Sequence, residues 1–146
     1  PEEMAPLIAR VARRGWHVVL HFDADQIPGL RPWIETLELP VLIDHCGRLC
    51  APDHGGADFD AFCALMERPN IWTKLSGVER GSVVGAPYDD MLPLLTTIAE
   101  IAPERVLWGT DWPHPVLSTP MPDDGDLVDY LWRSLPDESR RVRGCR

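Results

Sequence analysis

The sequence contains no apolar run that approaches the roughly 20 residues needed to cross a bilayer, and it shows no signal-peptide pattern. We therefore expect a cytoplasmic protein with no membrane partner. Basic residues are also few, since 14 Lys and Arg stand against 23 Asp and Glu and give a net charge of −9. Affinity for nucleic acid comes from cations that neutralise phosphates, so nucleic acid is not an expected partner.

Cysteine is scarce as well, with 4 residues in a chain of 146. In the absence of secretory features, reduced thiols are expected rather than disulfides. Cys46 and Cys50 have a separation that zinc-binding pairs use, but no second pair stands at a matching distance. The sequence therefore does not favour a structural zinc site.

The composition is otherwise that of an ordinary globular chain. Hydrophobic residues make up 45% and charged residues 25% of the 146 residues. A chain of this length buries roughly 68–70% of the surface that it exposes when unfolded. The 15 prolines fall mainly between the periodic segments, where they mark loops. We expect a single domain over residues 1–146.

Short apolar segments alternate along the chain with segments of helical periodicity. The apolar segments predict β-strands at residues 17–22, 40–43, 71–76 and 106–108. The helical spacing predicts helices near residues 4–14, 28–37, 59–68, 88–101 and 124–135. This alternation is typical of parallel β/α units, so the expected fold class is α/β.

Polar residues follow each predicted strand, at the point where the strand ends. In chain order these candidate site residues are His21, His45, Arg48, Arg80, Asp111 and His114. The carboxyl ends of neighbouring parallel strands share one face of the sheet, so we expect these side chains to meet there. Asp111 follows the apolar run 106–108 directly and is the candidate catalytic base.

Four motifs together resemble the amidohydrolase-related (amidohydrolase 2) family of TIM barrels. They are Asp44-His45-Cys46-Gly47-Arg48, Lys74-Leu75-Ser76-Gly77, Gly109-Thr110-Asp111-Trp112-Pro113-His114-Pro115 and Pro122-Asp123-Asp124-Gly125-Asp126-Leu127. Within that family the 2-pyrone-4,6-dicarboxylate lactonases are the most similar group. The resemblance implies that the four strands are strands five to eight of a (β/α)8 barrel, its C-terminal half.

The two ends of the chain depart from the family pattern. Such barrels carry a His-x-His pair after the first strand, which this sequence lacks, and residues 140–146 are unlike the closing segment. We therefore expect a fragment, shortened or altered in reading frame. A half-barrel would leave the strands at 17–22 and 106–110 as open edges, so we expect marginal stability or a homo-oligomer through those edges.

The resemblance also implies an activity, which is hydrolysis of a small carboxylated lactone such as 2-pyrone-4,6-dicarboxylate. Asp111 would act as the general base on water, and His45 would polarise the lactone carbonyl or orient the water. The implied substrate-binding residues are Arg80, Arg48, His21 and His114. An arginine can hold a carboxylate in a bidentate manner that lysine cannot match.

Lactonases of this kind are described as working without a metal, so no cofactor is expected. The alternative is a metal-dependent amidohydrolase or decarboxylase of the same superfamily. In that alternative Asp111 with His45 or His21 would hold a divalent ion such as zinc. A third possibility is a half-barrel that retains the motifs but catalyses nothing.

Each candidate also has a purely structural interpretation. Asp111 could cap a turn, and His45 could be a hydrogen-bonded core histidine. Arg80 could merely pair with Glu79 or Asp89 at the surface, where an ion pair contributes on the order of 0–1 kcal/mol. His17 is expected at the opposite end of the barrel and His54 in a solvated loop, and neither is assigned to the site.

Overall fold

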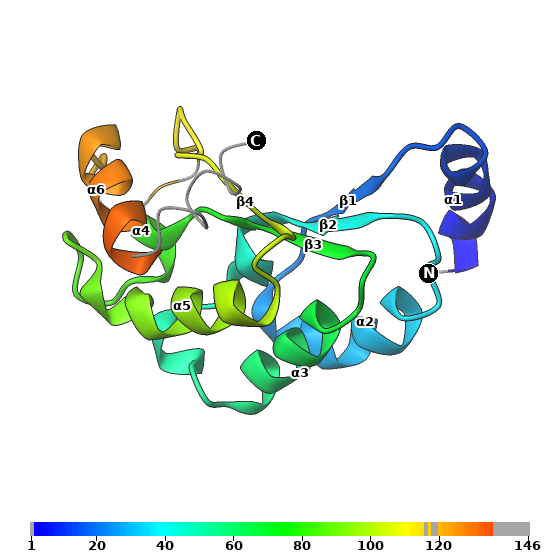
Figure 1. Ribbon diagram of the computed structural model, residues 1–146, viewed down its shortest axis with the longest axis horizontal. Coiled ribbons are helices and arrows are strands. Elements are labelled where there is room, and N and C mark those ends of the chain that lie inside the picture. The colour runs from blue at the N-terminus through cyan, green and yellow to red at the C-terminus, as the bar shows by residue number, and fades with distance from the viewer. Residues whose placement is uncertain (1, 116, 118–119, 136–146) are drawn as a thin grey trace.

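Four parallel strands form one sheet in a computed structural model that describes residues 2–115, 117 and 120–135 (Figure 1). The strands are β1 (Val18–Leu20), β2 (Val41–Ile43), β3 (Ile71–Leu75) and β4 (Val106–Trp108). They lie in the order β1-β2-β3-β4, and each neighbouring pair is parallel. The α/β class expected from the sequence is confirmed, although each strand except β4 is shorter than predicted.

Helices connect the strands as the alternation predicted. They are α1 (Ala5–Ala12), α2 (Ile27–Ile34), α3 (Ala57–Met66), α4 (Val78–Gly81), α5 (Leu92–Ile101) and α6 (Asp124–Ser134). Short 3₁₀ segments occur at Glu2–Met4, Ala24–Gln26, Asp44–Arg48, Ala51–Asp53 and Asp89–Met91. Neither α4 nor the segment Asp44–Arg48 was predicted. Asp44–Arg48 follows directly on β2, and two residues separate α4 from β3. Within the part of the chain that the structure describes, no helix has the length and apolar character to cross a membrane.

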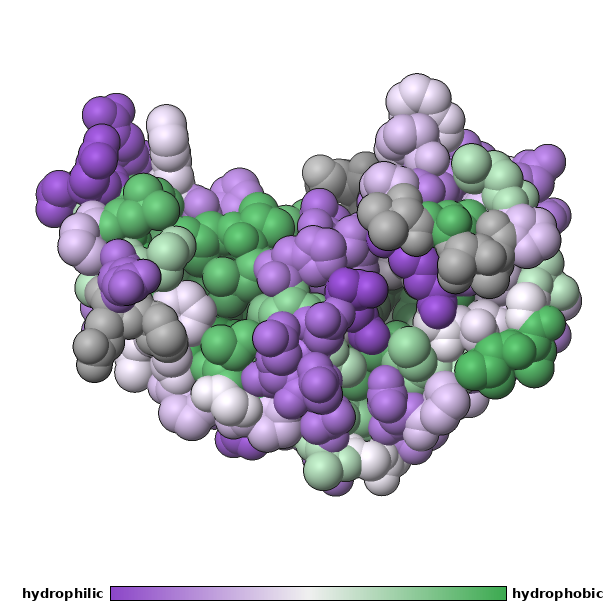
Figure 2. All heavy atoms as spheres, turned by 180° about the vertical axis from the view of Figure 1, so that it is seen from behind, coloured by the Kyte–Doolittle hydropathy of each residue, from purple (hydrophilic) through white to green (hydrophobic). Residues whose placement is uncertain are grey.

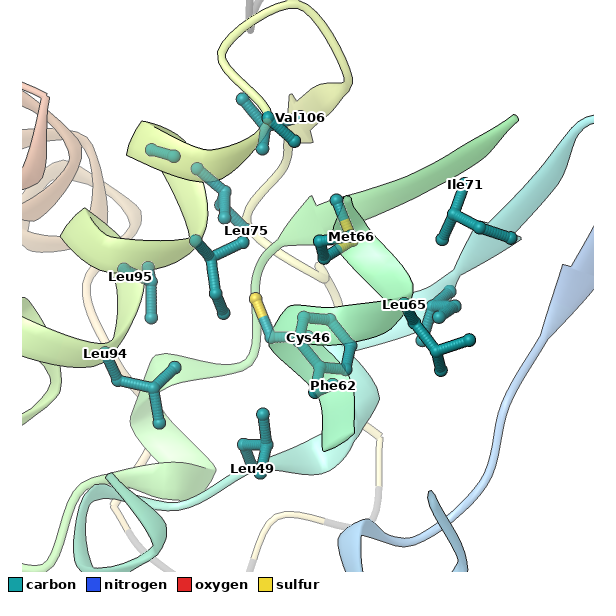
Figure 3. Close-up of a cluster of buried hydrophobic side chains, with 14 of the residues drawn as sticks. Cys46, Leu49, Phe62, Leu65, Met66, Ile71, Leu75, Leu94, Leu95 and Val106 are labelled. Atoms are coloured by element: carbon teal, nitrogen blue, oxygen red, sulfur yellow. The ribbon is translucent and has the colours of Figure 1, made fainter. Parts of the chain in front are cut away.

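The core lies between one face of the sheet and α2, α3 and α5, which occupy the same side of the strands in Figure 1. Period-two alternation selects the strand residues that face these helices. In β3 every second residue, beginning with Ile71, is buried, while Trp72 and Lys74 between them are half-buried. Figure 3 shows Phe62 and Leu65 of α3 together with Leu94 and Leu95 of α5, all of them fully buried.

The opposite face of the sheet is open. Strand register places Val19 beside Leu42, and Val19 is 49% exposed. An open apolar hollow of about 270 Å³ is lined by Gly15, His17, Pro40, Val41, Leu42, Trp72 and Leu107. Figure 2 shows hydrophobic residues at the surface on the side of α1, next to a hydrophilic band in the middle of that face. In a closed barrel this face of the sheet would be the interior.

The first helix is only partly packed. Of its apolar residues, Ile8 and Val11 pack against the core, while Leu7 is 48% exposed. In Figure 1 α1 lies beyond the amino ends of the strands, far from α4 and α6. The carboxyl ends of the strands therefore face the region of α4 and α6, where the predicted site residues follow.

Candidate active site

A left-handed turn after β2 carries two of the predicted site residues. The φ angles of His45, Cys46, Gly47 and Arg48 are 50°, 50°, 64° and 55°. This region disfavours residues with a side chain, so the surrounding structure must hold the turn in place. The Cys46 thiol donates to the Lys74 carbonyl oxygen at 3.2 Å. A Cβ at position 47 would lie 3.1 Å from the Phe62 ring, so glycine permits the close packing there.

Asp111 lies between a guanidinium and an imidazole. Its Oδ2 accepts a hydrogen bond from Nη2 of Arg80, and its Oδ1 is 3.5 Å from Nε2 of His45. Asp111 itself has a φ of 68°, in the left-handed region. These side chains come from segments that follow three different strands, β2, β3 and β4. The structure therefore brings together the predicted base and two predicted partners.

His45 makes further polar contacts on both sides of its ring. Its Nδ1 is 2.8 Å from the Ser76 hydroxyl oxygen, and its Nε2 is 3.7 Å from Oδ2 of Asp44. Burial lowers the pKa of His45 below its ordinary value of 6.5, while the charges of Asp44 and Asp111 oppose that effect. His45 is therefore expected to be a neutral imidazole at pH 7, suited to hydrogen bonding with water or a carbonyl.

A second ion pair borders this group. The Lys74 ammonium is 2.9 Å from Oδ1 of Asp44. Lys74 projects from β3 on the open face of the sheet, and Asp44 precedes His45 in the left-handed turn. The pair therefore fixes the start of the turn that carries His45.

Both predicted arginines line one small cavity with His45. The cavity has a volume of about 60 Å³ and is bordered by His45, Arg48, Leu49, Cys50, Gly77, Arg80 and Gly81. About 10–15 Å³ of such space holds one water molecule, so this cavity has room for a small group such as a carboxylate. Nη1 of Arg48 is 2.7 Å from Oδ1 of Asp23, which follows β1, and both side chains are exposed.

The other two histidines predicted for the site are His21 and His114. His21 is exposed, and its ring centroid is 5.5 Å from that of His45 in an edge-on arrangement. The His114 side chain is only 2% exposed and does not line the small cavity. Its Nδ1 is 3.4 Å from Glu79 and its Nε2 is 3.1 Å from Asp124. Substrate binding by His21 and His114 stays a prediction.

The sequence also allowed Arg80 to form only a surface ion pair with Glu79 or Asp89. The pair with Glu79 exists, but it does not lie at the surface. Nε of Arg80 is 3.6 Å from Oε1 of Glu79, but the Glu79 side chain is 1% exposed and so does not belong to the surface. Asp89 instead pairs with Arg133 of α6. His54 is exposed as expected, with its ring against Phe59.

Several residues of this site were not among those predicted. They are Asp23, Asp44, Lys74, Ser76, Glu79 and Asp124. Most of them stand next to a predicted residue or follow a strand, which is a signal that the sequence offers. Nothing local in the sequence, however, distinguishes a buried acid such as Glu79 from an exposed one.

A metal ion needs a group of ligand side chains, which can be sought among the described residues. Among the described residues, no group of three or more His, Cys, Asp or Glu side chains is arranged so that it could hold a metal ion. Burial raises the pKa of the Cys46 thiol to about 12. Cys145 lies outside the described residues.

Comparison with known proteins shows which family the chain is similar to. The profile of the amidohydrolase family matches residues 1–142. A 2-pyrone-4,6-dicarboxylate hydrolase from Comamonas testosteroni is 41% identical over 92% of this chain and 48% of its own length. A 4-sulfomuconolactone hydrolase from Hydrogenophaga intermedia is 42% identical over 88% of this chain and 43% of its own length.

A solved structure shares the fold of this chain. A crystal structure from Agrobacterium tumefaciens is 31% identical and superimposes with a TM-score of 0.81, covering 94% of this chain and 50% of the other. The chain thus spans about half the length of the relatives that it matches.

Proposed function

The chain belongs to the amidohydrolase family, and from that premise we propose that the protein carrying it hydrolyses a carboxylated lactone of the 2-pyrone-4,6-dicarboxylate type. One observation carries the proposal. His45, Arg48 and Arg80 border one cavity of carboxylate size, and Asp111 contacts two of the three. The hydrolases named above act on lactones that bear anionic groups, which suits two arginines at one cavity.

In the proposed reaction, Asp111 is the general base. It removes a proton from water as the water oxygen forms a bond with the lactone carbonyl carbon, giving a tetrahedral intermediate. The ring C–O bond then breaks, and the proton held by Asp111 passes to the departing ring oxygen. His45 orients the water or stabilises the carbonyl oxygen, where negative charge develops. The product is the ring-opened acid.

The pairing of Arg80 with Asp111 suggests how substrate binding activates the base. A substrate carboxylate that enters the small cavity competes with Asp111 for the Arg80 guanidinium. Once displaced, Oδ2 of Asp111 is free to accept a proton from water. Arg48, which is already 2.7 Å from Asp23, supplies the second cation for a substrate with two carboxylates.

Metal independence is part of the proposal. It is supported by the position of Arg80, because a guanidinium bound to Asp111 competes with a metal cation for the same carboxylate. Treatment with a chelator should leave the rate of lactone hydrolysis unchanged. Loss of activity that a divalent ion restores would favour the metal-dependent alternative, with Asp111 and His45 or His21 among the ligands.

Replacement of Asp111 by asparagine in the full-length protein tests the base. Asp111→Asn keeps the size of the side chain but cannot take up the proton, so we expect kcat for 2-pyrone-4,6-dicarboxylate to fall by about 10²–10⁴-fold. Asp129→Asn, on the exposed surface of α6, is the matched control and should keep full activity. Retention of more than a few per cent of activity by Asp111→Asn, with its melting temperature unchanged, would contradict the assignment.

A further inference from the structure

Glu79 is a buried carboxylate directly behind the proposed site. It lies in α4, one residue before Arg80, and its side chain is 1% exposed. Taking a carboxylate out of water is costly unless nearby cations or hydrogen-bond donors compensate for the lost hydration. The partners of Glu79 therefore indicate what its position does for the protein.

Those partners are one cation and one imidazole of the site. Oε1 of Glu79 is 3.6 Å from Nε of Arg80 and 3.4 Å from Nδ1 of His114. Oε2 of Glu79 is buried and has no hydrogen-bond partner among the described residues. Glu79 thus makes both of its polar contacts through one oxygen, and one of them leads to Arg80, which the proposed function uses.

His114 extends this arrangement to α6. Its Nε2 is 3.1 Å from Oδ1 of Asp124, in the first turn of that helix. A neutral imidazole donates from only one of its two nitrogens, yet both nitrogens of His114 face carboxylate oxygens. The ring is therefore held between Glu79 and Asp124, and the contacts run from Asp124 through His114 and Glu79 to Arg80.

Arg80 presents different nitrogens to its two carboxylates. Nε is 3.6 Å from Oε1 of Glu79, an ionic contact without a hydrogen bond, whereas Nη2 donates to Asp111. A substrate carboxylate that displaces Asp111 would take over the Nη side alone. The contact with Glu79 on the Nε side would persist, and the guanidinium would keep its direction toward the cavity.

We propose that Glu79 is a positioning residue, which holds Arg80 in the orientation that binds the substrate carboxylate and divides the charge of Arg80 between two acids. The inference rests on the proposed function, because it gives Arg80 the substrate carboxylate as its ligand. Without the charge of Glu79, Arg80 pairs with Asp111 more tightly and exchanges it for substrate less readily. Binding of the carboxylated substrate should suffer more than the chemical step.

Glu79→Gln in the full-length protein tests this role, because it removes the charge and keeps the shape. We expect KM for 2-pyrone-4,6-dicarboxylate to rise about 10–100-fold with a smaller change in kcat, as for other residues that orient a ligand-binding group. Glu100→Gln makes the same chemical change on the exposed end of α5 and should alter neither constant. A purely structural role would lower the active fraction, and thus kcat, while KM stayed the same, and that result would overturn the proposal.

A second measurement keeps the inference separate from the proposed activity. Pyridine-2,4-dicarboxylate has two carboxylates on a flat ring but no lactone to open, and its binding can be followed by calorimetry. Weaker binding of this probe to Glu79→Gln than to the wild type and Glu100→Gln supports the role of Glu79 even if the wild type hydrolyses no lactone. Equal binding by all three proteins overturns the role of Glu79, even if lactone hydrolysis is observed.

Discussion

The cations of the site are paired with carboxylates. Lys74 pairs with Asp44, and Arg80 contacts both Asp111 and Glu79. Lys74 is 37% exposed, and an ion pair that water can reach contributes little to stability, so its contact with Asp44 acts mainly by fixing direction. Glu79 is buried, so loss of its cation would leave a charge without compensation. Asp44 and Asp111 also influence His45, and this gives the site a dependence on pH that can be measured.

The pH dependence should follow the protonation of His45. Burial lowers the pKa of His45, and the negative charge of Asp44 raises it. Asp44→Asn removes that charge, so the pKa of His45 should be lower in this variant than in the wild type. If neutral His45 is required, kcat/KM should decline on the acid side below about pH 6.5 in the wild type. In Asp44→Asn the decline should move to lower pH.

The measurement is kcat/KM against pH for both proteins, with Asp129→Asn as a variant that loses a carboxylate far from His45. A decline that moves to higher pH in Asp44→Asn would contradict the assigned effect of Asp44. A decline in the same place in all three proteins would show that another group controls it.

The candidate residues show what a sequence can reveal about a site. His45, Arg80 and Asp111 could be named because each follows a strand, and parallel strands end on one face. The role of Glu79 could not be named, because its burial depends on how α4 turns back after β3. A four-residue helix has too few residues to show a periodic pattern.

Strands and helices could be predicted where residues close together in the sequence determine them. Apolar runs and helical spacing act within a few residues, so the order of strands and longer helices in the described residues matches the prediction, while the short helix α4 was not predicted. The turn at Asp44–Arg48 was not predictable, because Cys46 and Arg48 are residue types that seldom adopt positive φ. Contacts from β3 and α3, distant in sequence, hold that turn.

Arg105, next to β4, binds carbonyl oxygens between α3 and β3. Nη1 of Arg105, just before β4, is 2.7 Å from the carbonyl oxygens of Met66 and Arg68 and 2.8 Å from that of Ile71. These carbonyls belong to the end of α3 and the start of β3. Arg105 therefore ties the last turn of α3 to the segment that leads into β3.

Arg105→Ala should lower the free energy of unfolding of the full-length protein by about 2–3 kcal/mol, because hydrogen bonds to a charged group contribute about 1.5–3 kcal/mol. Chemical denaturation monitored by circular dichroism measures this change. Arg10→Ala, on the exposed surface of α1, is the control and should change stability by less than about 0.5 kcal/mol. An equally small change in Arg105→Ala would show that water replaces Arg105 at these carbonyls.

At the scale of the molecule, the sheet is open at both sides. Among the described strands, β1 pairs only with β2, and β4 pairs only with β3. The face of the sheet away from α2, α3 and α5 carries the apolar hollow of about 270 Å³. Unpaired edges and an exposed apolar face both favour association with further chain.

We therefore predict that a polypeptide of residues 1–146, produced alone, associates with further copies of itself. Its mass, measured by sedimentation over a dilution series, should rise with concentration, and its melting temperature should lie at or below the 45–65 °C usual for mesophilic domains. Val19→Lys places a charge on edge strand β1 at a position that is 49% exposed, so it should weaken association without loss of helix signal. A monomer at every concentration with a melting temperature above that range would contradict the prediction. Association unaffected by Val19→Lys would instead direct attention to the β4 edge, because the two edges are the backbone surfaces that a second sheet can extend.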